Sequence, residues 1–328
     1  MRKNWGISLL RWILSFVIVL AHFFDFHEGI ISNLILFFRE ATPSFMIIAF
    51  YFSAHIVLNG DSILIKKRMY RLMMPQFAWG IVFFFLYNAL ELGGVKFGFR
   101  DLVKQLIFGS PINGVLWFQF DLIILTLLFF YIFKILNENA VIVLAYFSVI
   151  CLVIQYLGYH MVLSDIVPSI ADSIGRLFET FPCATVGFIL YKYRLLDYLR
   201  AKWKPMIGLL VIIKGVGNLI GGPKYEGYGI AGVNVLIGAI CIVCIFYILP
   251  LDNIDTWIKN LIDFFSKYSM GVYIIHFPIG LFLNKFIMRS ELRMRRGLLF
   301  GIVVYGCSLL ISFAISCIPL KKCSDLVS

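Results

Sequence analysis

The first long apolar stretch of the chain, GISLLRWILSFVIVLAHFFDF at residues 6–26, determines the class of fold. A helix needs roughly 20 mostly apolar residues to cross a lipid bilayer. The preceding residues, Met1–Asn4, are basic as in a signal peptide, but no small-residue cleavage site follows the apolar run. We therefore expect this stretch to remain in the protein as its first membrane helix.

Nine further apolar runs of similar length follow. They lie at 36–58, 72–92, 115–136, 140–158, 172–191, 206–222, 229–249, 268–288 and 297–319. Of the 328 residues, 61% are hydrophobic and 14% are charged, whereas soluble domains are about 25% charged. These runs predict an all-α, polytopic membrane protein of about ten transmembrane helices. We expect one integral-membrane domain over residues 1–328, with no appended soluble domain.

The formal net charge of +11 reflects basic residues in the short loops between apolar runs. This pattern orients membrane proteins and does not indicate a nucleic-acid partner. With the N-terminus in the cytoplasm, sixteen lysines and arginines fall in cytoplasmic loops and eight in the opposite loops. We therefore expect both termini on the cytoplasmic side of the inner membrane. One cluster, Arg289, Arg293, Arg295 and Arg296, contradicts the rule and stays an open anomaly.

Ionisable residues inside apolar runs are costly, so each is a candidate for function. Arg11 and His22 are eleven positions apart in the first run, which places both on one helix face, roughly 16 Å apart along the axis. Asp25 follows three residues after His22, close enough to hydrogen-bond its ring. Two interpretations stay open: a functional polar stripe, or an arginine and a histidine that each reach the nearer membrane surface.

His276 lies inside the run at 268–288 and is followed by Pro278. A proline removes one backbone donor and loosens the local helix, as is common near sites in membrane proteins. The histidine is either part of a site or a hydrogen-bond partner between helices. No metal centre is predicted, because Cys241 and Cys244 have CxxC spacing but lie in an apolar helix without a second pair nearby.

Several short motifs occur along the chain in a fixed order, beginning with the arginine, ten residues and histidine of Arg11 and His22. The others are Phe50-Tyr-Phe-Ser-Ala-His55, Arg68 and Arg71 before Pro75, Leu116-Trp117-Phe118, and Ser269, Tyr273, His276 and Pro278. The ordered set resembles the integral-membrane acyltransferase family 3, whose members O-acylate polysaccharides and related acceptors. The second motif departs from the family pattern, since Ala54 and His55 replace its Gly-Phe.

The resemblance implies a ten-helix fold with an acyl-CoA, usually acetyl-CoA, as donor substrate and no permanently bound cofactor. The implied acceptor is a hydroxyl of a cell-envelope or exported glycan or glycolipid. Acyl transfer needs a base for the hydroxyl proton and stabilisation of the carbonyl oxygen. We assign the base to His22, its orientation to Asp25, and either oxyanion stabilisation or a share of the proton handling to His276.

Donor binding is assigned to Arg11, because a guanidinium holds phosphate with two hydrogen bonds. Arg68 and Arg71 are further candidates, with the setting of orientation as their alternative role. Trp117, Phe118 and Tyr273 are candidates for the substrate pocket, although aromatic packing also explains the first two. The partners implied are membrane lipids, acyl-CoA and the acceptor, and a homo-oligomer stays open.

A rival interpretation is a transporter or flippase of a small molecule or lipid-linked sugar, which also has many spans and buried charges. Such proteins often show matching half-repeats with paired interrupted helices, and we find none in this sequence. A purely structural scaffold would leave Arg11 and His22 unexplained.

Overall fold

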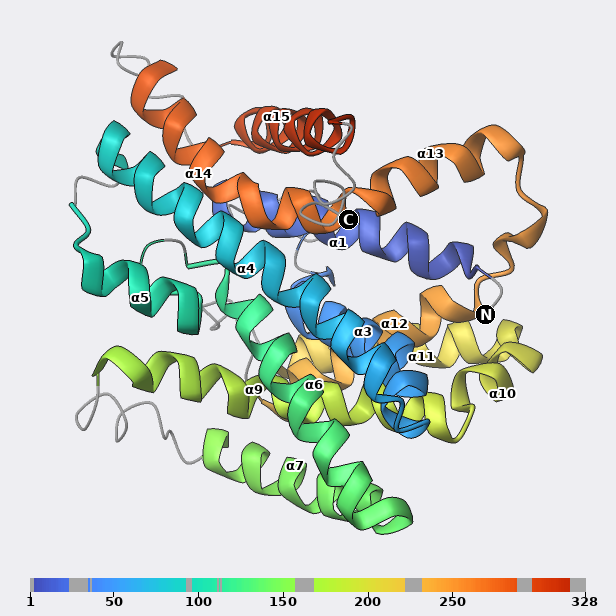
Figure 1. Ribbon diagram of the computed structural model, residues 1–328. Coiled ribbons are helices and arrows are strands. Elements are labelled where there is room, and N and C mark those ends of the chain that lie inside the picture. The colour runs from blue at the N-terminus through green and yellow to red at the C-terminus, as the bar shows by residue number, and fades with distance from the viewer. Residues whose placement is uncertain are drawn as a thin grey trace. The chain divides into compact units, whose positions relative to one another are not determined.

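The computed structural model describes residues 3–23, 35, 37–92, 96–110, 112, 114–156, 168–221, 232–287 and 297–318. Within these ranges every regular element is a helix (Figure 1). An α-helix satisfies all of its backbone hydrogen bonds within one segment, which hydrocarbon demands of a spanning element. The all-α prediction is confirmed for the described residues.

Each of the ten predicted runs contains a helix. These helices are α1 (Trp5–Phe23), α3 (Ala41–Leu58), α4 (Ser62–Leu90), α6 (Trp117–Leu136), α7 (Ala140–Tyr156), α9 (Pro168–Lys192), α11 (Trp203–Gly221), α12 (Val233–Ile248), α14 (Ser269–Ile287) and α15 (Leu298–Ser316). Among the described residues, five stretches are long and apolar enough to cross a membrane: α1, α3, α4, α15 and the 40 residues Trp117–Tyr156. The last stretch comprises α6 and α7, separated by a 3-10 turn at Asn137–Asn139. The number of crossings therefore stays a prediction.

Three helices lie outside the predicted runs: α5 (Phe99–Phe108), α10 (Leu195–Ala201) and α13 (Thr256–Lys267). In addition, α4 begins at Ser62, ten residues before the predicted run at 72–92. Its first turns carry the basic residues that were expected in a loop. Lysine and arginine are good helix formers, so a charged segment ends an apolar run without ending the helix.

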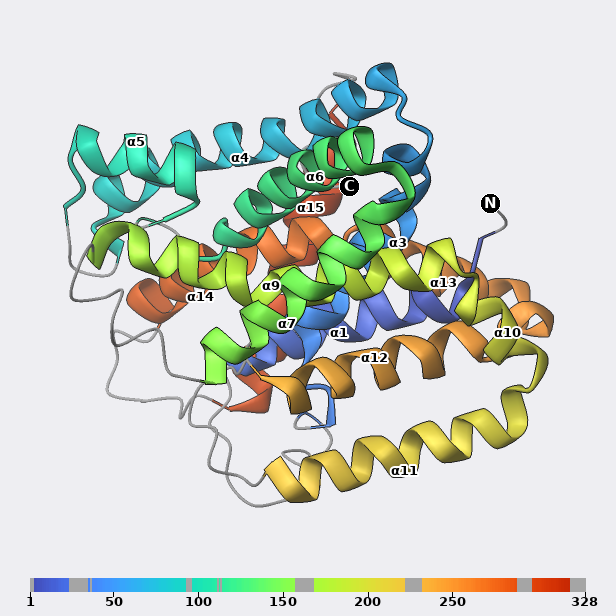
Figure 2. The same ribbon diagram turned by 90° about the horizontal axis from the view of Figure 1, so that it is seen from below.

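The chain forms two compact units, and each is described by itself. The first comprises Met1–Leu10, Phe37–Lys66 and Asp121–Lys259. Here α3 packs on α9, and Gly187 permits close approach because a Cβ there would collide with the carbonyl of Ile47. Helices α11 and α12 lie side by side (Figure 2). The aromatic rings of Phe50, Phe129 and Phe188 are fully buried in this unit.

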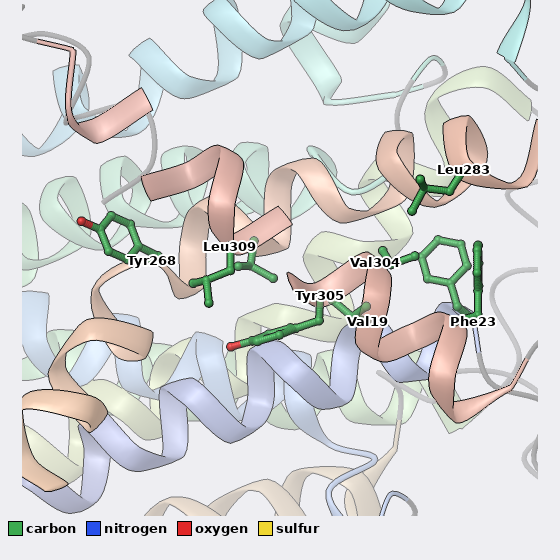
Figure 3. Packing of buried hydrophobic residues seen from close by; sticks show 9 residues of the cluster. Val19, Phe23, Tyr268, Leu283, Val304, Tyr305 and Leu309 are labelled. Atoms are coloured by element: carbon green, nitrogen blue, oxygen red, sulfur yellow. The ribbon is translucent and has the colours of Figure 1, made fainter. Parts of the chain in front are cut away.

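The second unit comprises Arg11–Leu36, Lys67–Phe120 and Asn260–Ser328. Its core gathers side chains from α1, α14 and α15, together with Tyr268 just before α14 (Figure 3). Gly301 of α15 lies so close to α1 that a Cβ would meet the side chain of Leu20. All of the predicted site residues except Asp25 are described in this unit, and Asp25 lies outside the described residues.

Within the second unit, α5 runs antiparallel to the C-terminal half of α4. Asn88 of α4 exchanges two hydrogen bonds with the backbone of Phe97, at 2.8 and 3.0 Å. Twelve residues earlier on α4, Gln76 Nε2 donates to the carbonyl of Gln105, 3.2 Å away, near the far end of α5. Gly109 then ends α5 with φ at +73°, in the left-handed region that suits glycine. The chain then continues from the end of α5 to Trp117, where α6 begins.

Candidate functional site

Helices α1 and α14 bring two histidines together from opposite ends of the chain. The ring centres of His22 and His276 are 5.2 Å apart, with the ring planes tilted by 37°. Phe277 meets the His22 ring edge-on, 5.6 Å from centre to centre. Phe23 contacts His276 in the same way at 6.3 Å. The two histidine rings therefore lie in one cluster of aromatic side chains.

Gly280, one turn after His276, makes room for this arrangement. A Cβ at that position would collide with the ring of Phe23. Figure 3 shows Phe23 beside Leu283 and Val304, and Phe300 also meets its ring edge-on. Because Phe23 follows His22 directly, its packing helps to set where the end of α1 lies.

His276 is completely buried, while His22 is exposed. Nδ1 of His276 lies 2.7 Å from the carbonyl oxygen of Tyr273 and 3.2 Å from that of Val272. Its Nε2 is buried and has no hydrogen-bond partner among the described residues. Buried polar atoms are nearly always paired, so an exception in a helix interior calls for an explanation.

Arg11 is joined to the start of α14. Its Nη2 donates a hydrogen bond to Ser269 Oγ at 3.2 Å, and Ser269 Oγ in turn donates to the carbonyl of Ser266 at 2.8 Å. Next to Arg11, the indole of Trp12 stacks on Phe265 of α13, with ring centres 4.3 Å apart. The guanidinium is half-buried and has a fixed neighbour, which differs from an arginine that simply extends to the membrane surface.

The predicted substrate residues are placed near the second histidine. Phe118 lies 5.3 Å from Tyr273 between ring centres, and Tyr273 lies 6.1 Å from His276. Trp117 meets Phe118 edge-on at 5.9 Å. All three side chains are buried. The structure thus connects the start of α6 to His276 through one aromatic row.

Arg68 and Arg71 are one turn apart on α4. Arg68 is half-buried, and its Nε has no hydrogen-bond partner in the described part of the chain. Arg71 is exposed. The hydrogen bond that fixes Arg11 involves Ser269 and neither of these arginines.

Two clusters in the first unit hold charges for which the sequence suggested no role. Asp121 is fully buried, and its Oδ2 lies 2.8 Å from the hydroxyl of Thr180. Glu40 binds Lys214 Nζ through both carboxylate oxygens at 2.7 Å. Sequence reasoning missed this second pair, although a lysine within an apolar run was a signal for a buried partner.

A family model described as an acyltransferase domain matches residues 4–319 of the 328. The chain belongs to acyltransferase family 3. The match covers every helix described above, so the two histidines and Arg11 lie inside the family domain. No curated protein and no solved structure matches the sequence.

The second unit of this membrane acyltransferase therefore contains groups suited to acyl transfer. An imidazole takes up and releases a proton near neutral pH, and a fixed guanidinium binds phosphate oxygens. The contact between His22 and His276 could not be predicted from their positions in the sequence. The fold brings the two ring centres to 5.2 Å although the residues lie near opposite ends of the chain.

Proposed function

We propose that this acyltransferase moves an acyl group, with acetyl as the first candidate, from acyl-CoA to a hydroxyl of a cell-envelope or exported glycan or glycolipid. The observation that carries the proposal is the 5.2 Å approach of the exposed residue His22 to the buried His276. The hydroxyl must lose its proton as it attacks the thioester carbon, and an imidazole within reach takes that proton.

Arg11 is the proposed contact for the phosphates of CoA. It precedes His22 by eleven residues on α1, a separation of roughly 16 Å along a helix of 1.5 Å rise per residue. The long pantetheine arm of CoA separates its phosphates from its thioester, so phosphate at Arg11 and thioester at His22 suit one extended donor. Arg68 and Arg71 are secondary candidates for the phosphates.

The row formed by Trp117, Phe118 and Tyr273 is the proposed wall of the substrate pocket. Its buried rings suit a short acyl chain of the donor rather than a bulky glycan. The phenolic ring of Tyr273 is the member closest to His276. Asp25 keeps its proposed role of orienting His22, although it lies outside the described residues.

We further propose that the chain crosses the inner membrane ten times, with both termini in the cytoplasm. Contacts within the second unit support the order of crossings. Arg11 meets Ser269 and His22 meets His276, so α1 and α14 run in the same direction. Lys285 near the end of α14 donates to the carbonyl of Leu90 at the end of α4, so these two also run together. Ten crossings make these helices the first, third and ninth, which all point outward.

Acyl transfer is favoured over a transporter or flippase by membership of the family. In a transporter, nothing would require Arg11 to lie at a distance from His22 and His276 that matches the pantetheine arm of CoA. Membrane lipids, acyl-CoA and the glycan or glycolipid acceptor are the proposed partners.

The test compares envelope glycans from cells with the protein, without it, and with the variant His22→Ala. Mass spectrometry should find an acetyl or other acyl group that disappears in the last two strains. His55→Ala is the matched control, because His55 lies on α3 in the other unit and its Nδ1 contacts the backbone carbonyl of Phe52, at 2.8 Å. Identical acylation in all strains contradicts the proposal.

A further inference from the structure

The hydrogen bonds of His276 determine which of its ring nitrogens carries a proton. Nδ1 lies 2.7 Å from the carbonyl oxygen of Tyr273 and 3.2 Å from that of Val272. A backbone carbonyl oxygen only accepts hydrogen bonds. Nδ1 must therefore be the donor, and it holds its proton against the helix backbone.

In the neutral ring the other nitrogen then has a lone pair and no proton. Nε2 of His276 is buried and has no hydrogen-bond partner among the described residues. Because Nε2 carries a lone pair and no proton, the resting ring can accept a proton at this atom but cannot donate one from it. This excludes the resting His276 as a hydrogen-bond donor to an oxyanion.

His276 is completely enclosed, so a bulky glycan cannot contact it directly. His22 is exposed and its ring centre lies 5.2 Å from that of His276. Two imidazoles joined by an N–H···N bond of about 3 Å have ring centres roughly 5 Å apart, because each nitrogen lies roughly 1 Å from its ring centre. The observed contact is a tilted ring contact without such a bond, and its 5.2 Å spacing leaves room for the bond when the His22 ring rotates.

We propose that His22 and His276 form a two-histidine proton relay in which His276 Nε2 holds the proton until the thiol of CoA leaves. This rests on the proposed function and assigns the steps within it. The acceptor hydroxyl gives its proton to one nitrogen of His22 as its oxygen forms the new bond to the thioester carbon. His22 passes the proton on its other nitrogen to His276 Nε2. The carbon–sulfur bond breaks with its electron pair on sulfur, and the proton returns by the same route to give the free thiol of CoA.

In this relay His22 is the catalytic residue that touches substrate, and His276 acts through it. The bond from Nδ1 to Tyr273 stabilises the imidazolium that His276 becomes, because a charged donor makes a stronger hydrogen bond. Tyr273 and Val272 therefore contribute through their backbone carbonyls. The aromatic row from Phe118 to Tyr273 helps to hold that backbone in place.

The first test is the tautomer of His276 in the intact protein. The chain has five histidines, so ring-¹⁵N-labelled protein in lipid nanodiscs gives few signals, and loss of one in His276→Gln assigns it. We expect a protonated Nδ1 and an unprotonated Nε2 at neutral pH. A protonated Nε2 on the resting ring overturns the relay whatever the activity of any variant.

The second test measures transfer from [¹⁴C]acetyl-CoA to envelope membranes from cells that lack the protein. We expect His276→Ala to lower kcat by about 100-fold or more, the usual contribution of acid–base catalysis, with the KM for acetyl-CoA unchanged. His276→Gln keeps most of the volume but cannot take up a proton, so it should be equally impaired. Added imidazole should restore part of the rate to His276→Ala.

A structural role would give the opposite results. If His276→Gln retains most of its activity, or if both variants raise KM while kcat stays the same, the relay is overturned and acyl transfer still stands. If the wild-type protein transfers no acyl group from any acyl-CoA, the proposed function fails and the relay fails with it. His55→Ala should match the wild type in every assay, since its ring also binds one backbone carbonyl but lies in the other unit.

Discussion

Arg11 Nη2 on α1 donates a hydrogen bond to Ser269 Oγ, the first residue of α14, across 3.2 Å and 258 positions of sequence. The serine hydroxyl donates its own proton to the carbonyl of Ser266. Its lone pairs are therefore left for the guanidinium. This connection fixes the cation that we assign to the CoA phosphates at one end of the α1–α14 contact, with the histidine pair at the other end.

Replacing Arg11 by lysine should remove most of the affinity for acyl-CoA. Lysine keeps the charge but lacks the planar fork that holds phosphate through two hydrogen bonds. Calorimetry of the purified protein in detergent measures the affinity, with Arg100→Lys on the exposed side of α5 as control. Unchanged affinity would move the CoA site away from Arg11, to Arg68 and Arg71.

Ser269→Ala should weaken acyl-CoA binding by roughly 1 kcal/mol, about fivefold, because Arg11 loses its hydrogen bond to the serine hydroxyl. Ser308→Ala is the matched control. Ser308 is also a buried helical serine, but its hydroxyl donates only to the carbonyl of Val304 in its own helix. The same calorimetric measurement serves both variants, and equal affinities for the two would show that Ser269 does not position Arg11.

Gly280→Ala should reduce transfer, because the added Cβ collides with the ring of Phe23 and displaces the end of α1 that carries His22. Gly306→Ala on α15 is the control, since no atom lies within 4 Å of a Cβ there. That control should be neutral or slightly stabilising, as alanine favours helix by about 1 kcal/mol over glycine. Full kcat in Gly280→Ala would show that the Phe23 contact does not affect His22.

Replacing one partner of the buried ion pair Glu40–Lys214 should destabilise the protein. Both side chains are buried and their charged groups lie 2.7 Å apart. Glu40→Gln leaves the buried Lys214 without a carboxylate and should cost about 3–5 kcal/mol. Lys214→Met should cost less, because Glu40 still accepts from Arg39 Nε at 3.0 Å, and Glu40→Leu with Lys214→Met should recover part of the cost of Glu40→Gln. Thermal unfolding in detergent gives the comparison.

A surface pair provides the reference for that cycle. Lys192 and Glu138 are 2.6 Å apart, but the glutamate side chain is 90% exposed. Glu138→Gln should cost less than about 1 kcal/mol. If single substitutions at both pairs cost the same, burial does not set the strength of the Glu40–Lys214 contact.

The predicted topology places Arg289–Arg296 outside the cytoplasm, and this segment lies outside the described residues. We expect a cysteine at Ser290, in a background without native cysteines, to react with a membrane-impermeant thiol reagent in intact cells. Lys202→Cys, in a predicted cytoplasmic loop, should react only after the membrane is opened. Labelling of Ser290→Cys only under that second condition would make the arginine cluster a cytoplasmic anchor.

The class of fold and the family can be read from the amino-acid sequence alone. Apolar runs long enough to span a bilayer predict helices, since each helix satisfies its own backbone within one local segment. The spacing of Arg11 and His22 is also local, so helical geometry placed both on one face. Helix boundaries in basic segments were less predictable, and α4 begins ten residues early because lysine and arginine do not break a helix.

Contacts between side chains far apart in the sequence could be seen only once the helices were packed together. Ser269 as the partner of Arg11, Lys214 as the partner of Glu40, and the 5.2 Å approach of His22 to His276 all depend on how helices pack. The sequence also could not predict that His276 Nδ1 carries the proton, because this follows from the 2.7 Å hydrogen bond between that atom and the carbonyl of Tyr273. Side-chain periodicity shows which face of a helix is polar, but packing alone selects the helix that this face meets.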